Sequence, residues 1–352
     1  MALIEVVSPR KATGKTAEAY HALYKMAGTK LAPNVIRIFS LRPDSMRRMI
    51  RLWELSSWSG DEPRETRELL ATIVSRLNDC HYCTDAHEAM MEAAGGKASR
   101  AARLLEGAAS DATPLELALT ALARKAQAQP KRLSTGDLDA LRALVGDAAL
   151  DYALVVAGFH FVNRVADLLD VDPEGLPEGL RRFELLRQFA GKGAAFLFRK
   201  AMDLKTRPYE KSYDEALESV APVFERVVGK PLKEQLELLR SRPKLVEAVQ
   251  IMLEERESSN LDAAILARID RTVEEALPAT TEEAEGLHAR PDDPVEAFAF
   301  IGTRYAHRSS EAMINALHRE GYDDRGILEL AIAIAHANQW ARLRRLTGLD
   351  LG

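Results

Sequence analysis

Apolar side chains recur at helical spacing along almost the whole chain, and this constrains the fold more than any other feature. Leu69, Ile73 and Leu77 follow one another at intervals of one helical turn, and the segment 327–334 repeats the pattern near the other end. Such spacing places the side chains on one face of an α-helix. The strict alternation of apolar and polar residues expected of half-buried strands is nearly absent. Ala, Leu, Arg and Glu are abundant, so the sequence predicts an all-α protein.

Chain length and internal similarity both predict two units. A chain of 352 residues is more typical of about two domains than of one. LRPDS (41–45) precedes a helical stretch containing LLATIV (69–74). RSRPK (240–244) precedes ILARID (265–270) in the same order. We infer a tandem duplication of one helical unit.

The two predicted units span residues 1–178 and 205–352, with a connecting stretch at 179–204. The two units differ at the positions of the candidate catalytic residues. Aligning LLATIV with ILARID places Ala264 opposite Glu68, Ala276 opposite Cys80, Ala279 opposite Cys83 and Glu283 opposite His87. We therefore expect the second unit to be a packing or oligomerisation partner and not a second active site.

Charge and hydropathy exclude two classes of partner. The formal net charge is -5, with acids and bases mixed along the chain, so no basic tract is present for nucleic acid or a membrane surface. No apolar run approaches the roughly 18 residues that span a bilayer, and residues 1–15 lack the apolar core of a signal peptide. We expect a cytoplasmic protein that binds neither nucleic acid nor membrane.

The two cysteines are the most informative residues for chemistry. Cys80 and Cys83 are three positions apart in a chain without another cysteine, so the pair is predicted to be catalytic or metal-binding and not part of a structural disulfide framework. On a helix, Cys80, Cys83 and His87 share one stripe. Their spacing also allows a disulfide.

Asn78 or Asp79 is a suitable N-cap for a helix starting near Cys80. The dithiol would then lie in a first helical turn, where the helix dipole favours a thiolate. His87 could accept the thiol proton, and Glu68 could orient the imidazole.

The pattern Glu68, eleven residues, Cys80-His-Tyr-Cys83, three residues, His87 resembles the signature of the alkylhydroperoxidase D and carboxymuconolactone decarboxylase superfamily, in its peroxidase-related branch. The lead-in at 12–43 and the helical segment at 153–169 extend the resemblance to about residues 5–172. The second unit follows it more weakly, as a degenerate copy.

The resemblance implies an alkylhydroperoxidase D-like helical fold and peroxide reduction by a dithiol. Cys83 matches the position that attacks the hydroperoxide and becomes a sulfenic acid, and Cys80 matches its resolving partner. Glu68 and His87 match the proton-relay positions. No flavin, haem or metal cofactor is implied, a separate dithiol would donate electrons, and homo-oligomers are expected. Tyr82 stands where alkylhydroperoxidase D has histidine, and decarboxylases of the superfamily lack the cysteine pair.

Other interpretations remain open at this point. The cysteines could be two buried helical residues or half of a metal site, and the dithiol could serve as a thiol-disulfide oxidoreductase or a redox sensor. His160, Asn163 and Arg164 could line a pocket or pack between helices. Trp53 and Trp58 suit core packing or pocket walls.

Overall fold

The computed structural model describes residues 2–173, 205–228, 235–286 and 288–349. Within these residues the only strand-like pairing is an isolated bridge between Ser59 and Arg207, and every named element is helical. The all-α prediction is confirmed. The connecting stretch predicted at 179–204 lies outside the described residues.

The first half of the chain carries nine α-helices joined by short helical turns. They are α1 (Gly14–Ala27), α2 (Asn34–Arg37), α3 (Pro43–Trp53), α4 (Arg64–Leu77), α5 (His81–Ala93), α6 (Arg100–Leu105), α7 (Pro114–Ala128), α8 (Asp139–Val145) and α9 (Ala149–Leu168). The turns are η1 (Ile38–Leu41), η2 (Glu54–Trp58), η3 (Pro130–Arg132), η4 (Thr135–Leu138) and η5 (Gly146–Ala148).

In the second half, the described residues form a corresponding set of helices. They are α11 (Tyr213–Val228), α13 (Pro243–Glu257), α14 (Ala263–Ala276), α15 (Thr281–Glu285), α16 (Pro294–Arg304), α17 (Glu311–Arg319) and α18 (Asp324–Thr347), with turns η6 (Glu237–Leu239) and η7 (Ala306–Arg308).

Local sequence explains where several of these helices begin. Pro43 and Pro243 occupy the first turns of α3 and α13, where a missing amide hydrogen costs nothing. Thr113 caps α7 by accepting a hydrogen bond from the amide of Glu116, and Asp293 caps α16 through its side chain in the same way. Both pairs lie at matching places in the two predicted units.

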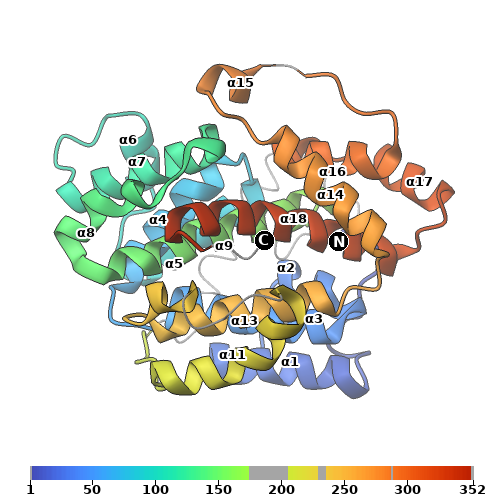
Figure 1. The fold of residues 1–352 in the computed structure, drawn as a ribbon, viewed down its shortest axis with the longest axis horizontal. Coiled ribbons are helices and arrows are strands. Elements are labelled where there is room, and N and C mark those ends of the chain that lie inside the picture. Colours follow the sequence, from blue (N-terminus) through green and yellow to red (C-terminus); the bar gives the residue numbers. More distant parts are fainter. Residues whose placement is uncertain (1, 174–204, 229–234, 287, 350–352) are drawn as a thin grey trace.

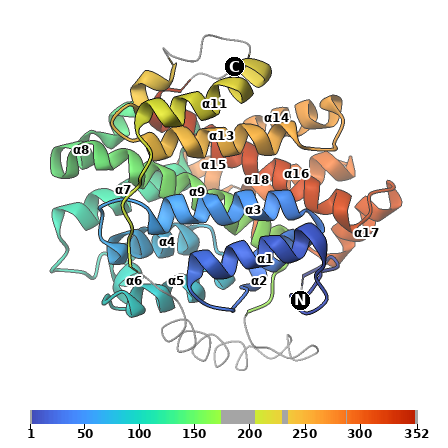
Figure 2. The ribbon, with the colours of Figure 1, turned by 90° about the horizontal axis from the view of Figure 1, so that it is seen from below.

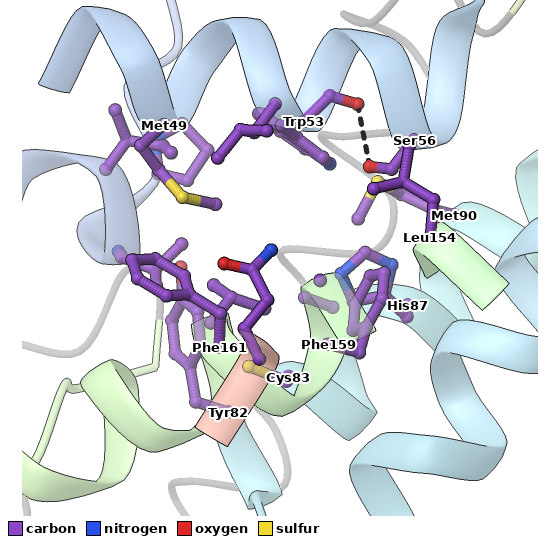
Figure 3. A pocket seen from close by; sticks show the side chains of 18 residues that line it. Met49, Trp53, Ser56, Tyr82, Cys83, His87, Met90, Leu154, Phe159 and Phe161 are labelled. Atoms are coloured by element: carbon purple, nitrogen blue, oxygen red, sulfur yellow. Dashed lines mark hydrogen bonds between the residues drawn. The ribbon is translucent and has the colours of Figure 1, made fainter. Parts of the chain in front are cut away.

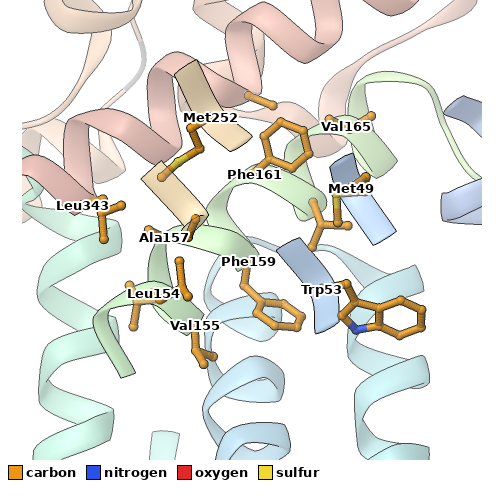
Figure 4. Packing of buried hydrophobic residues seen from close by; sticks show 14 of the residues in the cluster. Met49, Trp53, Leu154, Val155, Ala157, Phe159, Phe161, Val165, Met252 and Leu343 are labelled. Carbon is orange, nitrogen blue, oxygen red and sulfur yellow. The ribbon is translucent and has the colours of Figure 1, made fainter. Parts of the chain in front are cut away.

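Two long helices, α9 and α18, lie side by side through the middle of the molecule (Figure 1). Almost every residue of α9 is buried. Figure 4 shows Phe161 and Val165 of α9 near Met252 of α13, and Leu343 of α18 belongs to the same buried cluster. One continuous apolar core therefore includes residues from both halves of the chain.

Each half of the chain contains a similar pair of packed helices and sends one buried arginine to the other half. α1 packs on α3 and α11 packs on α13 (Figure 2). Arg164 of α9 donates to the carbonyl of Thr303 in α16 at 3.1 Å, and Arg342 of α18 donates to the carbonyl of Ala126 in α7 at 2.9 Å. This reciprocal exchange supports the predicted duplication, which stays a prediction.

No helix in the described part of the chain is both long and apolar enough to cross a lipid bilayer.

Candidate active site

A tight turn between α4 and α5 brings the predicted site residues together. Asp79 has a φ of 57°, in the left-handed region that aspartate tolerates better than most residues. The Cys80 amide donates to the carbonyl of Ser75 at 3.0 Å, and the Cys80 carbonyl accepts from the amide of Thr84 at 3.0 Å. Cys80 itself is the N-cap of α5. The expected cap at Asn78 or Asp79 is wrong, because a left-handed Asp79 lacks the extended backbone that an N-cap adopts.

Asn163 of α9 holds this turn in place. Asn78 donates through Nδ2 to the Asn163 side-chain oxygen at 2.9 Å, and Asn163 donates through its own Nδ2 to the Ser75 hydroxyl at 3.1 Å. Asn163 is completely buried. His160 and Arg164 are also buried and bond to one another at 2.9 Å. None of the three lines the pocket beside Cys83, whereas Asn163 and Arg164 line a separate polar cavity.

The two thiols differ in environment although both are buried and unbridged. Burial raises the pKa of the Cys80 thiol well above its ordinary value, and Cys83 and Asp167 raise it further. Cys80 is therefore a protonated thiol near neutral pH, and the expectation that the helix start favours a thiolate is wrong for this cysteine.

Glu68 and His87 form a buried pair. The carboxylate Oε2 lies 2.6 Å from His87 Nδ1, and Arg64 Nε donates to the other carboxylate oxygen at 2.5 Å. Burial alone would raise the pKa of Glu68, but the Arg64 charge and His87 outweigh it and lower this pKa below its ordinary value. An ionised carboxylate only accepts hydrogen bonds, so Nδ1 carries the imidazole hydrogen. Nε2 is left as the nitrogen that can accept a proton.

Arg64 was not identified from the sequence. Its guanidinium stacks on the Trp58 ring at 3.8 Å from the centroid and donates to the carbonyl of Ser57 at 2.9 Å. The Trp58 ring also meets Trp53 edge-on at 4.8 Å. Arg64 precedes Glu68 by one helical turn, and this spacing was the signal that could have revealed it.

A pocket that is partly open to solvent adjoins these residues (Figure 3). Cys83 and His87 lie on its wall, whereas Cys80 and Glu68 do not line it. Most of the remaining wall is apolar, including Trp53, Phe159 and Phe161. The edge of Phe159 meets the His87 ring at a centroid distance of 4.5 Å and an interplanar angle of 86°, which fixes the imidazole plane.

Asp167 of α9 interacts with Cys80 but does not line this pocket. Burial raises the pKa of Asp167 to about 8, although Cys80 and Arg164 both lower it. Asp167 also lines a polar cavity that includes Asn78 and His307. Asp167 was not predicted from the sequence, where its only distinguishing feature is its position one turn after Arg164.

No group of three or more histidine, cysteine or acidic side chains in the described ranges is arranged to hold a metal ion.

Comparison with known proteins finds a family model that matches the part of the chain containing Cys80 and Cys83. Residues 43–125 match the model of the carboxymuconolactone decarboxylase family. These residues include all four predicted site residues, Glu68, Cys80, Cys83 and His87. The chain carries a carboxymuconolactone decarboxylase family domain.

Two known proteins are similar to parts of this chain. An alkyl hydroperoxide reductase of Mycobacterium tuberculosis is 30% identical over 198 residues, which cover 53% of this chain and 51% of that protein. The chain thus spans about half the length of this curated relative. A crystal structure titled as an alkylhydroperoxidase AhpD core, a peroxidase-related protein from Ralstonia eutropha JMP134, is 24% identical with a TM-score of 0.43, and the match covers 49% of this chain and 93% of that one.

Proposed function

We propose that the protein is a dithiol-dependent peroxidase that reduces organic hydroperoxides or hydrogen peroxide through Cys83 and Cys80. The observation that carries the proposal is the unequal placement of the two thiols. Cys83 shares a pocket wall with His87, whereas Cys80 is fully buried, does not line the pocket and has a raised pKa. Of the two thiols, Cys83 is therefore the one that borders space a substrate can occupy.

In the first step, His87 Nε2 takes the proton of the Cys83 thiol. The thiolate attacks the terminal oxygen of the hydroperoxide, the O–O bond breaks, and Cys83 becomes a sulfenic acid. The leaving alkoxide takes the proton back from His87 and departs as an alcohol. Glu68 supports this exchange because its carboxylate stabilises the positively charged imidazole formed between the two transfers.

In the second step, the Cys80 sulfur attacks the Cys83 sulfenic acid, forming a disulfide and releasing water. Cys80 must lose its proton for this attack, and Asp167, whose pKa Cys80 influences, is the acceptor we propose. A separate dithiol then reduces the disulfide and becomes a disulfide itself. A protein or a small molecule can fill this role, and assembly into homo-oligomers remains part of the proposal.

The lining of the pocket favours hydroperoxides with an apolar substituent over hydrogen peroxide. Met49, Trp53 and Phe161 offer apolar surface to such a group, and burying that surface contributes to binding. A relative named as an alkyl hydroperoxide reductase supports the same preference.

The test is cumene hydroperoxide consumption with dithiothreitol as reductant. We expect Cys83→Ser to abolish turnover and Cys80→Ser and His87→Ala to weaken it. His81→Ala is the matched control, because His81 lies on the same helix but is exposed. Wild-type turnover no faster than that of Cys83→Ser would overturn the proposal, and rapid disulfide exchange in its place would identify a thiol-disulfide oxidoreductase.

A further inference from the structure

One polar side chain in the Cys83 pocket comes from the other half of the chain. Gln339 belongs to α18, is 1% exposed, and lines the pocket together with Cys83 and His87. Its carboxamide oxygen is buried without a hydrogen-bond partner. Among the described residues of this pocket wall, no other has a buried side-chain oxygen or nitrogen that lacks a hydrogen-bond partner.

The other polar groups of the wall are already engaged within the protein. The Ser56 hydroxyl donates to the carbonyl of Trp53 at 3.1 Å (Figure 3). The Tyr82 hydroxyl accepts from the amide of Val35 at 3.3 Å. His87 Nδ1 is bonded to Glu68. These groups are held in place by the fold, whereas the Gln339 oxygen has its hydrogen-bonding capacity unused.

Folding alone does not explain an amide at this position. A buried acceptor without a partner destabilises a protein, and an apolar residue of similar size would suit the surrounding wall better. The adjacent Asn338 illustrates the usual outcome, because its amide donates to the Thr303 hydroxyl and to the Ile334 carbonyl, each at 3.0 Å. An unsatisfied acceptor beside a reactive thiol points to a bound molecule that donates a hydrogen bond.

We propose that Gln339 binds the hydroperoxide group and makes the second half of the chain part of the active site. This inference rests on the proposed peroxidase function. The carboxamide oxygen accepts a hydrogen bond from the terminal O–H of the substrate, which is the oxygen that the Cys83 thiolate attacks. No bond to Gln339 forms or breaks. The same O–H persists in the sulfenic acid after the O–O bond has broken, so the hydrogen bond holds substrate and product alike.

The role predicts a defect limited to molecules that carry this donor. Gln339→Met keeps the size of the side chain and removes the acceptor. Loss of one neutral hydrogen bond lowers kcat/KM for cumene hydroperoxide by about tenfold. Methyl methanethiosulfonate has no O–H or N–H, so its reaction rate with Cys83, measured in a Cys80→Ser background, stays unchanged.

The experiment measures both rates and the thermal unfolding temperature for wild type and Gln339→Met. We expect an unfolding temperature equal to or above that of wild type, because an unsatisfied buried acceptor is removed. Equal kcat/KM in an active wild type and in the variant would overturn the role of Gln339 alone. A clear fall in unfolding temperature, or an equal loss with both reagents, would assign the amide to the fold. Absence of hydroperoxide turnover in wild type would instead contradict the proposed peroxidase function.

Discussion

At the scale of single residues, the site separates two chemically identical thiols by their neighbours. Cys83 faces an apolar pocket beside a histidine whose Nδ1 is fixed by Glu68, whereas Cys80 is fully buried against Asp167. Burial in apolar surroundings keeps a thiol protonated. The proposed order of the two chemical steps rests on this difference.

Glu68 is predicted to support both stability and catalysis. Its pKa is lowered in the folded protein, so its stabilising effect is present above its unfolded pKa and disappears as pH falls through the lower folded value. Glu68→Gln leaves Arg64 as an uncompensated buried charge. At pH 7 we expect a loss of about 3 kcal/mol in unfolding free energy and about a hundredfold fall in kcat/KM.

Urea unfolding at pH 7 and at pH 3, with parallel kinetics, checks this prediction. The gap between wild type and Glu68→Gln should narrow at the lower pH, because below the unfolded pKa the unfolded chain binds a proton on Glu68 and the stabilising effect of the folded carboxylate shrinks. A gap of constant size would show that the Glu68 charge does not stabilise the fold.

Asp167 is predicted to control the second chemical step. Since its pKa is raised to about 8, the fraction able to accept the Cys80 proton grows as pH rises through that value. Disulfide formation in wild type should therefore accelerate between pH 7 and 9. Asp167→Asn should form the disulfide about tenfold more slowly and accumulate sulfenic acid, which dimedone labelling followed by mass spectrometry measures. A rate and pH profile equal to those of wild type would exclude this role.

The same carboxyl has the opposite effect on stability from Glu68. A carboxyl with a raised pKa in the folded state is destabilising where it is ionised only in the unfolded chain. The destabilisation caused by Asp167 therefore grows as pH rises from the unfolded pKa of this carboxyl, near 3.8, to its folded pKa of about 8. Asp167→Asn removes this pH-dependent cost.

At the scale of elements, the turn between α4 and α5 determines where the thiols point. Asn163 connects this turn to α9 through hydrogen bonds with Asn78 and Ser75. Asn163→Ala removes both bonds and is expected to lower the unfolding free energy by about 2 kcal/mol. It should also slow the reaction of Cys83 with cumene hydroperoxide, because the turn loses its fixed position. Chemical denaturation and single-turnover kinetics measure the two effects, and a change in neither would contradict the role.

Helical periodicity and the polar residues Asn78 and Asp79 were enough to predict α4, α5 and the break between them. The family resemblance was needed to single out Glu68. The left-handed backbone of Asp79 was not predicted, because sequence spacing does not reveal it. Arg64 could have been found from its position one turn before Glu68. Gln339 could not, since only the packing of α18 against α9 brings it to the pocket.

At the scale of the whole molecule, polar contacts join the two halves around the common core. Lys244 bonds to Asp151 at 3.0 Å, and Arg42 pairs with Glu329 at 3.0 Å, all four side chains being buried. Removing one partner from such a pair leaves an uncompensated buried charge. The halves are therefore interdependent in this fold even if they arose by duplication.

This interdependence predicts the behaviour of the separated first half. A chain ending at residue 178 would expose the face of α9 that packs on α18, together with the partners of the removed charges. We expect it to aggregate or to unfold without a cooperative transition, because a large apolar surface has lost its cover. Circular dichroism during heating and size-exclusion chromatography test this expectation. A monomeric fragment with cooperative unfolding would show that residues 1–178 form an independent domain.

The central claim, that Cys83 reacts with the hydroperoxide and Cys80 resolves it, is tested most directly by intact-mass spectrometry. Reduced protein is mixed with one equivalent of cumene hydroperoxide and quenched in acid. The account predicts the mass of a disulfide in wild type, one added oxygen on Cys83 in Cys80→Ser, and no change in Cys83→Ser. An oxygen added to Cys80 in Cys83→Ser at the wild-type rate, or no disulfide in wild type, would contradict it.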